Sequence, residues 1–295
     1  MDSIDIKTLK VNEFHKEYVK RILNLKFPIF SIIEFNLHGS CNRRCAFCPR
    51  VDEDLWPNKD EEFSIELFTK IINELKEINY SGRISFSGFS EPTLHSKLPQ
   101  ILLLIKNNLP DSFPEIITNG DYLNEKKLNE FFESGLKFIY VSLYTNKQTY
   151  DKLVKLKKDL NLSDYQFSIR PRNLGSKNNF GLNLNNRAGA VDYSTFGKKI
   201  EEKFPLKQTC NYPMYTIFVD YNGDTLICPN DWDKRKVIGN VNKDHILNIW
   251  NNEQFKNVRQ RLLNKDRNAK PCEKCNVNGL HVGKEFSNMW QKFYK

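Results

Sequence analysis

The sequence predicts an α/β protein: a parallel sheet curved into an open, partial barrel of five or six βα units, followed by a small second domain. Between residues 30 and 170, short apolar runs rich in β-branched residues alternate with amphipathic segments of helical length. Such alternation is typical of βαβ crossovers and hence of a parallel sheet. After residue 205 it gives way to a hairpin-like pattern. Because a closed barrel needs eight strands, an open barrel fits this segment better.

The individual elements follow from local signals. The segment at 64–79 spaces its apolar residues as one face of a helix does, and Ser64 precedes it as an N-cap. Asn124 is placed to cap a helix at 125–134, which Gly135 would end. Residues 173–197 are rich in glycine and asparagine and have no convincing period, which predicts a long loop or lid. In full, strands are expected at 30–37, 83–87, 115–118, 137–143 and 165–170, with further helices at 97–109 and 147–160 and a helical extension at 1–29.

The second domain is expected at 205–280. Asn222-Gly223 lies between the β-rich runs YTIFVD and TLIC, and Asn-Gly in that setting is a strong signal for a β-hairpin. Apolar residues at helical spacing then predict one helix over 244–263. These assignments leave the barrel at 30–204 and a C-terminal tail at 281–295.

The composition excludes several classes of protein. With 39% hydrophobic residues, the chain of 295 residues can bury a core. No apolar run approaches the roughly 18 residues of a membrane span, and the N-terminus lacks the apolar core of a secretory signal, so a cytoplasmic protein is expected. The net charge of +9 is spread over interspersed acidic and basic residues, and no nucleic-acid reader motif is visible, so nucleic acid is not an expected partner.

Seven cysteines, an odd number, are not expected to form a disulfide framework in an intracellular protein. Three of them, Cys41, Cys45 and Cys48, form a C-x3-C-x2-C motif directly after the first strand. A structural zinc site wants four ligands, so three thiolates are an incomplete set for zinc. They are a complete set for a four-iron cluster whose last iron is reserved for a substrate or cofactor.

The other four cysteines are Cys210 and Cys228, which bracket the predicted hairpin, and the C-x2-C pair Cys272 and Cys275. Four thiolates fit either a zinc ion or an iron–sulfur cluster. Residue types and spacing alone leave both alternatives open.

The first cysteine motif, with Phe47 before its third cysteine, resembles the signature of the radical S-adenosylmethionine (SAM) superfamily. The segment Gly88-Phe89-Ser90-Glu91-Pro92, after the second strand, resembles that family's GGEP motif, with serine in place of the second glycine. The resemblance implies a 4Fe–4S cluster that binds SAM, with Phe47 approaching the adenine through its backbone. It further implies SAM contacts from Phe89, Ser90 and Glu91, beside Gly88, to the methionyl ammonium, and from Asn119, Ser142 and Arg170 to the ribose and carboxylate.

The region around the other four cysteines resembles the SPASM/twitch extension of radical SAM enzymes. The similarity lies in Cys228-Pro229-Asn230-Asp231-Trp232, Ile238-Gly239-Asn240-Val241, Ile249-Trp250 and the C-x2-C pair. A full SPASM domain carries more cysteines, whereas four match the shorter twitch form with one auxiliary 4Fe–4S cluster. Together the two resemblances cover residues 30–280 and imply SAM, two 4Fe–4S clusters and a flavodoxin- or ferredoxin-type electron donor.

A third motif, Asn186-Arg187-Ala188-Gly189, recurs among sugar- and aminocyclitol-modifying members of this group. The resemblance implies that Arg187 faces the active site and contacts polar groups of the substrate, with a surface position on the loop as the alternative. Tyr144, Asn230 and Asp231 are further candidates on the substrate side. His38 is placed either to support the cysteine motif or to face solvent.

The number of cysteines narrows the reaction. Three plus four accounts for all seven, which leaves no thiol to donate hydrogen and disfavours radical epimerases that use one. The leading hypothesis is a two-electron oxidation of a secondary alcohol in a carbohydrate, aminocyclitol or similar small polar molecule, with the auxiliary cluster accepting an electron. Alternatives are a sugar epimerase or dehydratase, modification of a ribosomally made peptide, and a zinc-stabilised binding protein without catalytic activity. The substrate, the general base and the oligomeric state are not predicted.

Overall fold

The computed structural model describes residues 29–171, 185–192, 203–280 and 287–294, together with Glu13, Glu17 and Val282. The helical extension predicted at 1–29 lies outside these residues except for Glu13, Glu17 and Ile29, and the loop predicted at 173–197 lies outside them except for 185–192. The chain divides into two compact units. We call residues 35–43 and 58–184 the α/β unit, and residues 1–34, 44–57 and 185–295 the cysteine-rich unit.

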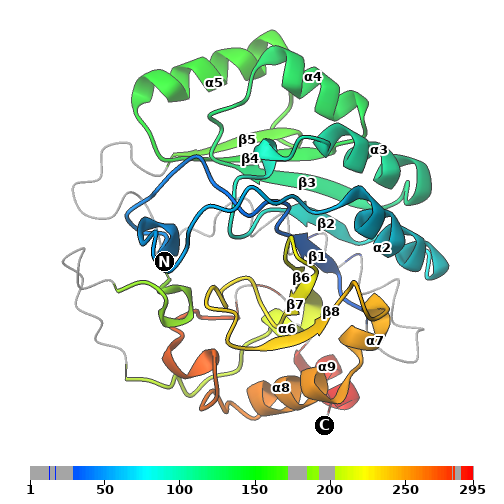
Figure 1. The fold of residues 1–295 in the computed structure, drawn as a ribbon, viewed down its shortest axis with the longest axis vertical. Helices are drawn as coiled ribbons and strands as arrows, with labels where there is room; N and C mark the ends of the chain where they lie inside the picture. Colours follow the sequence, from blue (N-terminus) through cyan, green and yellow to red (C-terminus); the bar gives the residue numbers. More distant parts are fainter. Residues whose placement is uncertain are drawn as a thin grey trace. The chain divides into compact units, whose positions relative to one another are not determined.

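The α/β unit is built on four parallel strands with helices between them (Figure 1). The strands pair in the order β2 (Arg83–Phe86), β3 (Phe113–Thr118), β4 (Phe138–Leu143) and β5 (Phe167–Pro171). The helices that alternate with them are α2 (Ile65–Glu77), α3 (Leu98–Asn108), α4 (Glu125–Glu133) and α5 (Lys147–Asp159). The predicted βαβ alternation and parallel sheet are confirmed. Because all four strands run the same way, the loops that follow them lie at one edge of the sheet.

Local signals explain these helices. The Ser64 side chain accepts a hydrogen bond from the Leu67 N–H, and the Asn124 side chain accepts one from the Lys127 N–H, as N-caps do. Gly135 follows α4 with a φ of +106°, the left-handed conformation in which glycine ends helices. The buried apolar face of α2 consists of Phe68, Ile71, Ile72 and Leu75. Burial of each such side chain contributes about 1.5–3 kcal/mol, so packing rather than propensity holds the helix.

The cysteine-rich unit contains an antiparallel meander. Its strands are β6 (Thr216–Val219), β7 (Asp224–Leu226) and β8 (Val237–Asn240). The β6–β7 turn is the predicted hairpin: Gly223, at a φ of +86°, donates its N–H to the Asp220 carbonyl at 2.8 Å. Strand β8 was not predicted, because it is short and Gly239 interrupts its apolar pattern. Strand β1 (Ile32–Phe35) lies at the boundary of the two units, and just before it the Ser31 N–H donates to the Tyr215 carbonyl at 2.9 Å.

The single helix predicted over 244–263 is wrong. The structure has two helices, α7 (Ile246–Trp250) and α8 (Glu253–Leu263), separated at Asn251 and Asn252. The Asn252 side chain accepts a hydrogen bond from the Phe255 N–H at 2.8 Å, so it caps α8. Its amide also donates to the Ile238 carbonyl of β8 at 2.7 Å. This contact with a distant strand fixes Asn252 outside a helix, although the apolar periodicity runs on past it.

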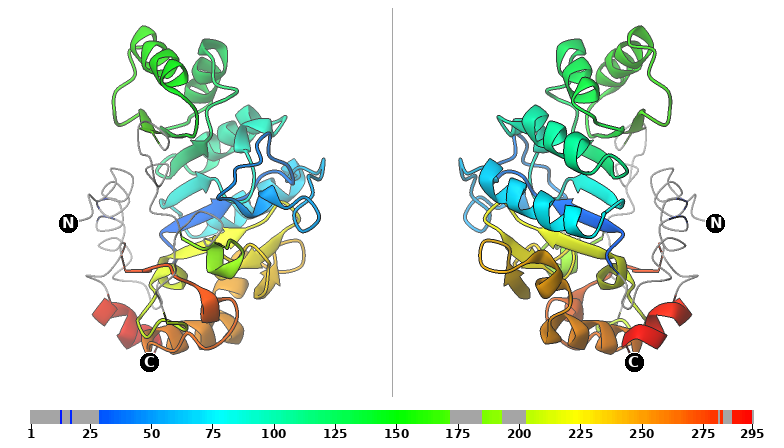
Figure 2. Two further views of the ribbon diagram at one scale, coloured as in Figure 1. Left: turned by 90° about the vertical axis from the view of Figure 1, so that its left-hand side faces the viewer. Right: turned by 90° about the vertical axis from the view of Figure 1, so that its right-hand side faces the viewer.

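The core of the cysteine-rich unit joins three helices to one strand. Helices α8 and α9 (Ser287–Tyr294) lie side by side (Figure 2), and α6 (Tyr212–Tyr215) packs against α8. The Trp290 ring stacks on the Tyr215 ring with centroids 6.2 Å apart. The buried cluster is Ile32, Met214, Tyr215, Leu262, Leu263, Trp290 and Tyr294.

Short 3₁₀ turns complete the described chain at Pro49–Val51, Pro92–Leu94, Arg187–Gly189 and Cys272–Lys274. No helix among the described residues is both long enough and apolar enough to cross a membrane.

Candidate functional site

Cys41 lies in the α/β unit, on the loop that follows β1. Asn58 holds its backbone on both sides: the Asn58 side chain accepts from the Cys41 N–H at 3.1 Å and donates to the Cys41 carbonyl at 3.1 Å. On the same loop, the Ser40 N–H donates to Nδ1 of His38 at 2.9 Å. His38 is buried, so of its two expected positions the solvent-facing one is wrong. The imidazole supports the loop that carries the first cysteine.

Cys45 and Cys48 lie in the cysteine-rich unit. They are joined by a tight turn in which the Cys48 N–H donates to the Cys45 carbonyl at 2.9 Å. Burial raises the pKa of the Cys48 thiol, while a backbone hydrogen bond from Arg50 and the charges of Arg187, Arg50 and Arg44 act in the opposite direction. Cationic surroundings favour the thiolate, which is the form that ligates iron.

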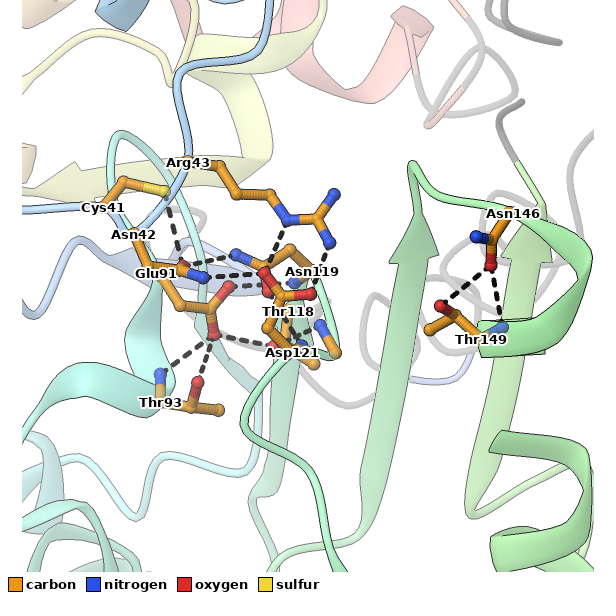
Figure 3. Close-up of polar contacts among 11 residues, drawn as sticks. Cys41, Asn42, Arg43, Glu91, Thr93, Thr118, Asn119, Asp121, Asn146 and Thr149 are labelled. Carbon is orange, nitrogen blue, oxygen red and sulfur yellow. Dashed lines mark hydrogen bonds and ion pairs between the residues drawn. The ribbon is translucent and has the colours of Figure 1, made fainter. Parts of the chain in front are cut away.

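The Glu91 carboxylate links the end of β2 to the end of β3 (Figure 3). Its Oε1 accepts hydrogen bonds from the Thr93 N–H at 3.1 Å, from the Thr93 hydroxyl at 2.6 Å and from the Thr118 hydroxyl at 2.6 Å. Its Oε2 accepts from the Asn119 N–H at 2.8 Å. Glu91 is only 2% exposed, and this burial raises its pKa although the four hydrogen bonds act to lower it. The carboxylate is therefore held by four donors in a dry site.

A second network ties the loop of the first cysteine to the end of β3, also seen in Figure 3. The Asn119 side chain donates to Asn42 Oδ1 at 2.8 Å, and the Asn42 side chain donates to Asp121 at 2.7 Å. Arg43 forms an ion pair with the same Asp121 carboxylate and donates to it through Nε at 2.6 Å. Sequence reasoning named Asn119 but missed Asn42, Arg43 and Asp121. These residues fix the backbone between Cys41 and Cys45.

The remaining candidates of the α/β unit lie at the same edge of the sheet. Ser142 of β4 is the register partner of Arg170 of β5, and Tyr144 follows β4 directly. The Ser90 hydroxyl donates to Asn36 Oδ1 at 2.5 Å. The predicted SAM contacts of this unit, all on or just after β2 to β5, are Gly88, Phe89, Ser90, Glu91, Asn119, Ser142 and Arg170. The sheet thus gathers these predicted SAM contacts at one edge, while Phe47, which is buried, belongs to the cysteine-rich unit.

All four remaining cysteines line one cavity within the cysteine-rich unit. Cys210 precedes α6, Cys228 follows β7, and Cys272 and Cys275 bracket a 3₁₀ turn in which the Cys275 N–H donates to the Cys272 carbonyl at 3.1 Å. Three separate segments of chain therefore converge here. The other lining residues are Ala188, Tyr212, Pro213, Ile227, Asn230, Leu262, Arg267, Pro271 and Val277.

The thiols of this cavity raise one another's pKa. Burial, followed by the charges of the neighbouring sulfurs, raises the pKa of Cys272 to about 12. Burial raises the pKa of Cys275 to about 11, with Cys210 adding to the effect. The pKa of Cys228 is raised by burial and then by Cys272, Cys275, Asp231 and Cys210. Four sulfurs that repel each other's charge in a buried site need a bound cationic centre in order to ionise together.

The four cysteines can supply every protein ligand of one 4Fe–4S cluster. Such a cluster takes one thiolate at each of its four irons, and the four cysteines line one pocket. The donor set is therefore suited to a 4Fe–4S cluster with no open iron.

The 3₁₀ turn Arg187–Gly189, which we call the Arg187 turn, is held by hydrogen bonds to the segment that carries Cys272 and Cys275. Three consecutive residues are left-handed: Arg187 at a φ of 47°, Ala188 at 54° and Gly189 at 95°. Such a conformation costs about 1–3 kcal/mol per non-glycine residue and persists only where its surroundings impose it. Asn186 and Asn276 supply part of that restraint, because each backbone N–H donates to the other's side chain, at 2.7 and 3.2 Å. The Asn186 amide also donates to the Lys274 carbonyl at 2.6 Å, and the Arg235 guanidinium donates to the Ala188 carbonyl.

The Arg187 side chain is half-buried, and its charge acts on Cys48 and on Tyr212. Burial raises the pKa of Cys48, and the Arg187 charge opposes that rise. Burial likewise raises the pKa of Tyr212, which lines the four-cysteine cavity, and Arg187 again opposes it. The guanidinium therefore lies within electrostatic range of Cys48 and of a residue that lines the four-cysteine cavity.

Asp231 is fully buried, and its carboxylate accepts hydrogen bonds from backbone N–H groups. Its Oδ1 accepts from the Arg235 N–H at 3.0 Å and its Oδ2 from the Lys236 N–H at 2.9 Å. Burial raises the pKa of Asp231, and these two hydrogen bonds act to lower it. Both oxygens hold the loop between β7 and β8, which also carries Arg235 to the Arg187 turn. Asn230, its neighbour, lines the four-cysteine cavity.

Gly279→Ala is expected to reduce loading of the four-cysteine site. Gly279 has a φ of +73°, and a Cβ atom added there would lie 2.5 Å from Cys210 Sγ and 3.0 Å from Cys210 Cα. Cys210 must then shift, and iron in the reconstituted protein should fall from about eight toward about four atoms per chain. The control is Gly135→Ala, at a φ of +106° after α4, which imposes a comparable left-handed strain but touches no cysteine. Equal iron content in the two variants would contradict the expectation.

Comparison with known proteins agrees with this arrangement. The family model of the radical SAM superfamily matches residues 35–161, and the model of SPASM, an iron–sulfur cluster-binding domain, matches residues 210–276. Residues 35–161 thus form a radical SAM domain, and residues 210–276 form a SPASM domain. A radical SAM domain followed by a SPASM domain implies SAM and two 4Fe–4S clusters as cofactors, as predicted. A zinc-stabilised binding protein does not account for these matches.

Matches to known proteins extend over most of this chain. It is 28% identical over 258 residues to the S-adenosyl-L-methionine-dependent 2-deoxy-scyllo-inosamine dehydrogenase of Niallia circulans, which covers 84% of this chain and 93% of that one. The crystal structure of BtrN in complex with AdoMet and 2-DOIA superposes with a TM-score of 0.71 at 25% identity, covering 88% of this chain and 98% of that one. Native anSMEcpe with bound AdoMet shares the fold at a TM-score of 0.53 and 12% identity, covering 89% and 95% of the two chains. The predicted fold class is confirmed.

Proposed function

We propose that this radical SAM enzyme oxidises a secondary alcohol of an aminocyclitol-like small molecule to the ketone. The observation that carries the proposal is the similarity to the Niallia circulans dehydrogenase, which extends over 84% of the chain and so over both domains. The four-cysteine cavity supports it, because a two-electron oxidation needs an acceptor for the second electron. A cluster with four protein ligands has no open iron for substrate and suits that role.

When bound, SAM at the first cluster would supply abstraction of a carbon-bound hydrogen atom, and the auxiliary cluster would supply an electron acceptor. The balance on the substrate is then complete. Its carbon loses a hydrogen atom, its hydroxyl loses a proton to a base, and one further electron leaves as the C=O bond forms.

In this proposal, the residues of the chain bind and orient SAM and the substrate. The Glu91 carboxylate, held by four donors, fixes the loop after β2, which by family resemblance lies at the methionyl amino group. The Arg187 guanidinium provides donors for a substrate oxygen, and its charge favours loss of the hydroxyl proton. The restrained left-handed turn keeps that guanidinium in place before substrate arrives. The largely apolar wall of the four-cysteine cavity keeps water away from the electron acceptor.

In this proposal, a flavodoxin or ferredoxin supplies the electron that starts turnover. The enzyme is then expected in the cytoplasm, together with such a donor. The net charge of +9 favours docking of such acidic donors, because opposite charges steer encounter.

The test is anaerobic turnover of the reconstituted protein with a panel of aminocyclitols deuterated at each carbinol carbon. Deuterium is expected in 5′-deoxyadenosine from one labelled position, together with the corresponding ketone.

Arg187→Ala should lower kcat/KM about 100-fold, because the variant loses roughly 2–3 kcal/mol of charge-assisted hydrogen bonding to the substrate. Uncoupled SAM cleavage should continue. The control is Lys147→Ala, an exposed cation that forms an ion pair with Asp151 of the same helix, and it should retain full activity.

Other outcomes of the same experiment identify the alternatives. Substrate hydrogen replaced from solvent without a change in oxidation state would indicate an epimerase, and loss of water would indicate a dehydratase. Deuterium transfer only from a labelled peptide would overturn the proposal.

A further inference from the structure

Arg267 is a buried cation held by backbone carbonyls. It is 1% exposed. Its Nε donates to the Gln208 carbonyl at 2.9 Å and its Nη1 to the Val277 carbonyl at 2.8 Å. Its Nη2 donates to the Thr209 carbonyl at 3.0 Å and to the Asn278 carbonyl at 3.1 Å. These bonds use four of the five N–H groups of the guanidinium.

These carbonyls place the charge beside the auxiliary cysteines. Gln208 and Thr209 immediately precede Cys210, and Val277 and Asn278 follow Cys275. Arg267 also lines the cavity that the four cysteines share. Its charge lowers the pKa of Cys210, Cys272 and Cys275, against the larger effect of burial, which raises all three. Three of the four sulfurs therefore experience its field.

Within the described part of the chain, no carboxylate forms an ion pair with Arg267. Its contacts are neutral carbonyls, which satisfy the N–H groups but do not cancel the charge. A buried charge without a counter-charge is costly, and a negative centre beside it lowers that cost. Four thiolates around a cluster are the negative charge that this cavity is built to hold.

We propose that Arg267 is a positioning cation that raises the reduction potential of the auxiliary cluster and so makes it a better electron acceptor. The inference rests on the proposed function only in giving that potential a use. Reduction adds one negative charge to the cluster. A fixed positive charge at its edge, in a medium of low dielectric, stabilises the reduced form relative to the oxidised one. The four carbonyl bonds hold the guanidinium so that it cannot turn away when the charge changes.

The test is a potentiometric titration of the auxiliary cluster followed by electron paramagnetic resonance. The full-length chain carries alanine at Cys41, Cys45 and Cys48, so that the auxiliary cluster is the only iron centre. Arg267→Met and Arg267→Gln remove the charge, whereas Arg267→Lys keeps it without the planar fork. The midpoint potential of the auxiliary cluster is expected to move to more negative values in the Met and Gln variants. In the Lys variant it should stay close to the potential of the protein that keeps Arg267.

Arg259→Met is the matched control. Arg259 is also a fully buried arginine of the cysteine-rich unit. It donates to the Pro213 carbonyl at 2.8 Å and to the Trp250 carbonyl at 2.7 Å, and it does not line the four-cysteine cavity. Its replacement should lower the unfolding midpoint without moving the potential.

The outcomes separate charge from scaffolding. An unchanged potential in both charge-removing variants would overturn the inference. So would failure of all three Arg267 variants, Lys included, to take up iron, because the hydrogen-bonding fork rather than the charge would then be what the site needs. Iron uptake by Arg267→Lys but not by the Met and Gln variants would support the charge. If the potential shifts as expected but no alcohol is oxidised by the unaltered enzyme, the proposed function fails and the role of Arg267 stands.

Discussion

Replacing Cys272 and Cys275 together with alanine is expected to lower the iron content from about eight to about four atoms per chain and to abolish alcohol oxidation, while SAM cleavage continues. The two cysteines supply half of the ligands in the four-cysteine cavity, and Cys210 and Cys228 alone cannot hold a cluster there. The first cluster depends on a separate cysteine set. Formation of 5′-deoxyadenosine should therefore persist, whereas ketone formation should fall more than about 100-fold.

Lys274→Ala is the matched control for this prediction. Lys274 lies between the two cysteines, its side chain is exposed, and alanine keeps the carbonyl to which Asn186 donates. Iron and ketone formation should both remain at the level of the unaltered enzyme. Ketone formation at full rate in the double cysteine variant would show that the second electron does not leave through the auxiliary cluster.

The helices and strands of the α/β unit could be predicted because their signals are local. Ser64 and Asn124 cap helices with their own side chains, and Gly135 ends one through its own backbone. The break between α7 and α8 could not be predicted in this way. Asn252 there follows an apolar periodicity that continues past it, and what holds it out of a helix is the carbonyl of Ile238 in β8.

The residues of the candidate site also differ in whether a local sequence signal marks them. The cysteines could be recognised because each set includes ligands separated by two or three residues. Asp121 had a usable signal, since it directly follows Thr118-Asn119-Gly120 at a strand end. Arg267 had none: it reaches the Gln208 carbonyl across 59 positions of sequence, and nothing near it marks a buried cation. Asn276 likewise acquires its role only because the chain returns to Asn186.

Glu91→Ala is expected to destabilise the protein by at least about 3 kcal/mol and to abolish SAM binding. The substitution leaves the Thr93 N–H and hydroxyl, the Thr118 hydroxyl and the Asn119 N–H without their shared acceptor in a buried site. Each stranded donor costs roughly 1–3 kcal/mol, only part of which relaxation recovers. Glu91→Gln keeps one acceptor oxygen but turns an NH₂ group toward a donor, so an intermediate loss is expected. Denaturant unfolding of the cluster-free chain measures the first effect, and equilibrium dialysis of SAM with reconstituted protein measures the second.

Glu62→Ala separates the Glu91 site from carboxylates in general. Glu62 belongs to the same unit and accepts hydrogen bonds from the Ser96 N–H and hydroxyl, both at 2.6 Å, but its side chain is 29% exposed. Water can replace the lost acceptor there, so a loss of no more than about 1 kcal/mol is expected, with SAM binding unchanged. If Glu91→Ala lost stability but still bound SAM at the affinity of the unaltered enzyme, the carboxylate would be a brace between β2 and β3 and not part of the SAM site. If it lost SAM binding with no change in unfolding, water would have to reach the buried donors, against the 2% exposure of the carboxylate.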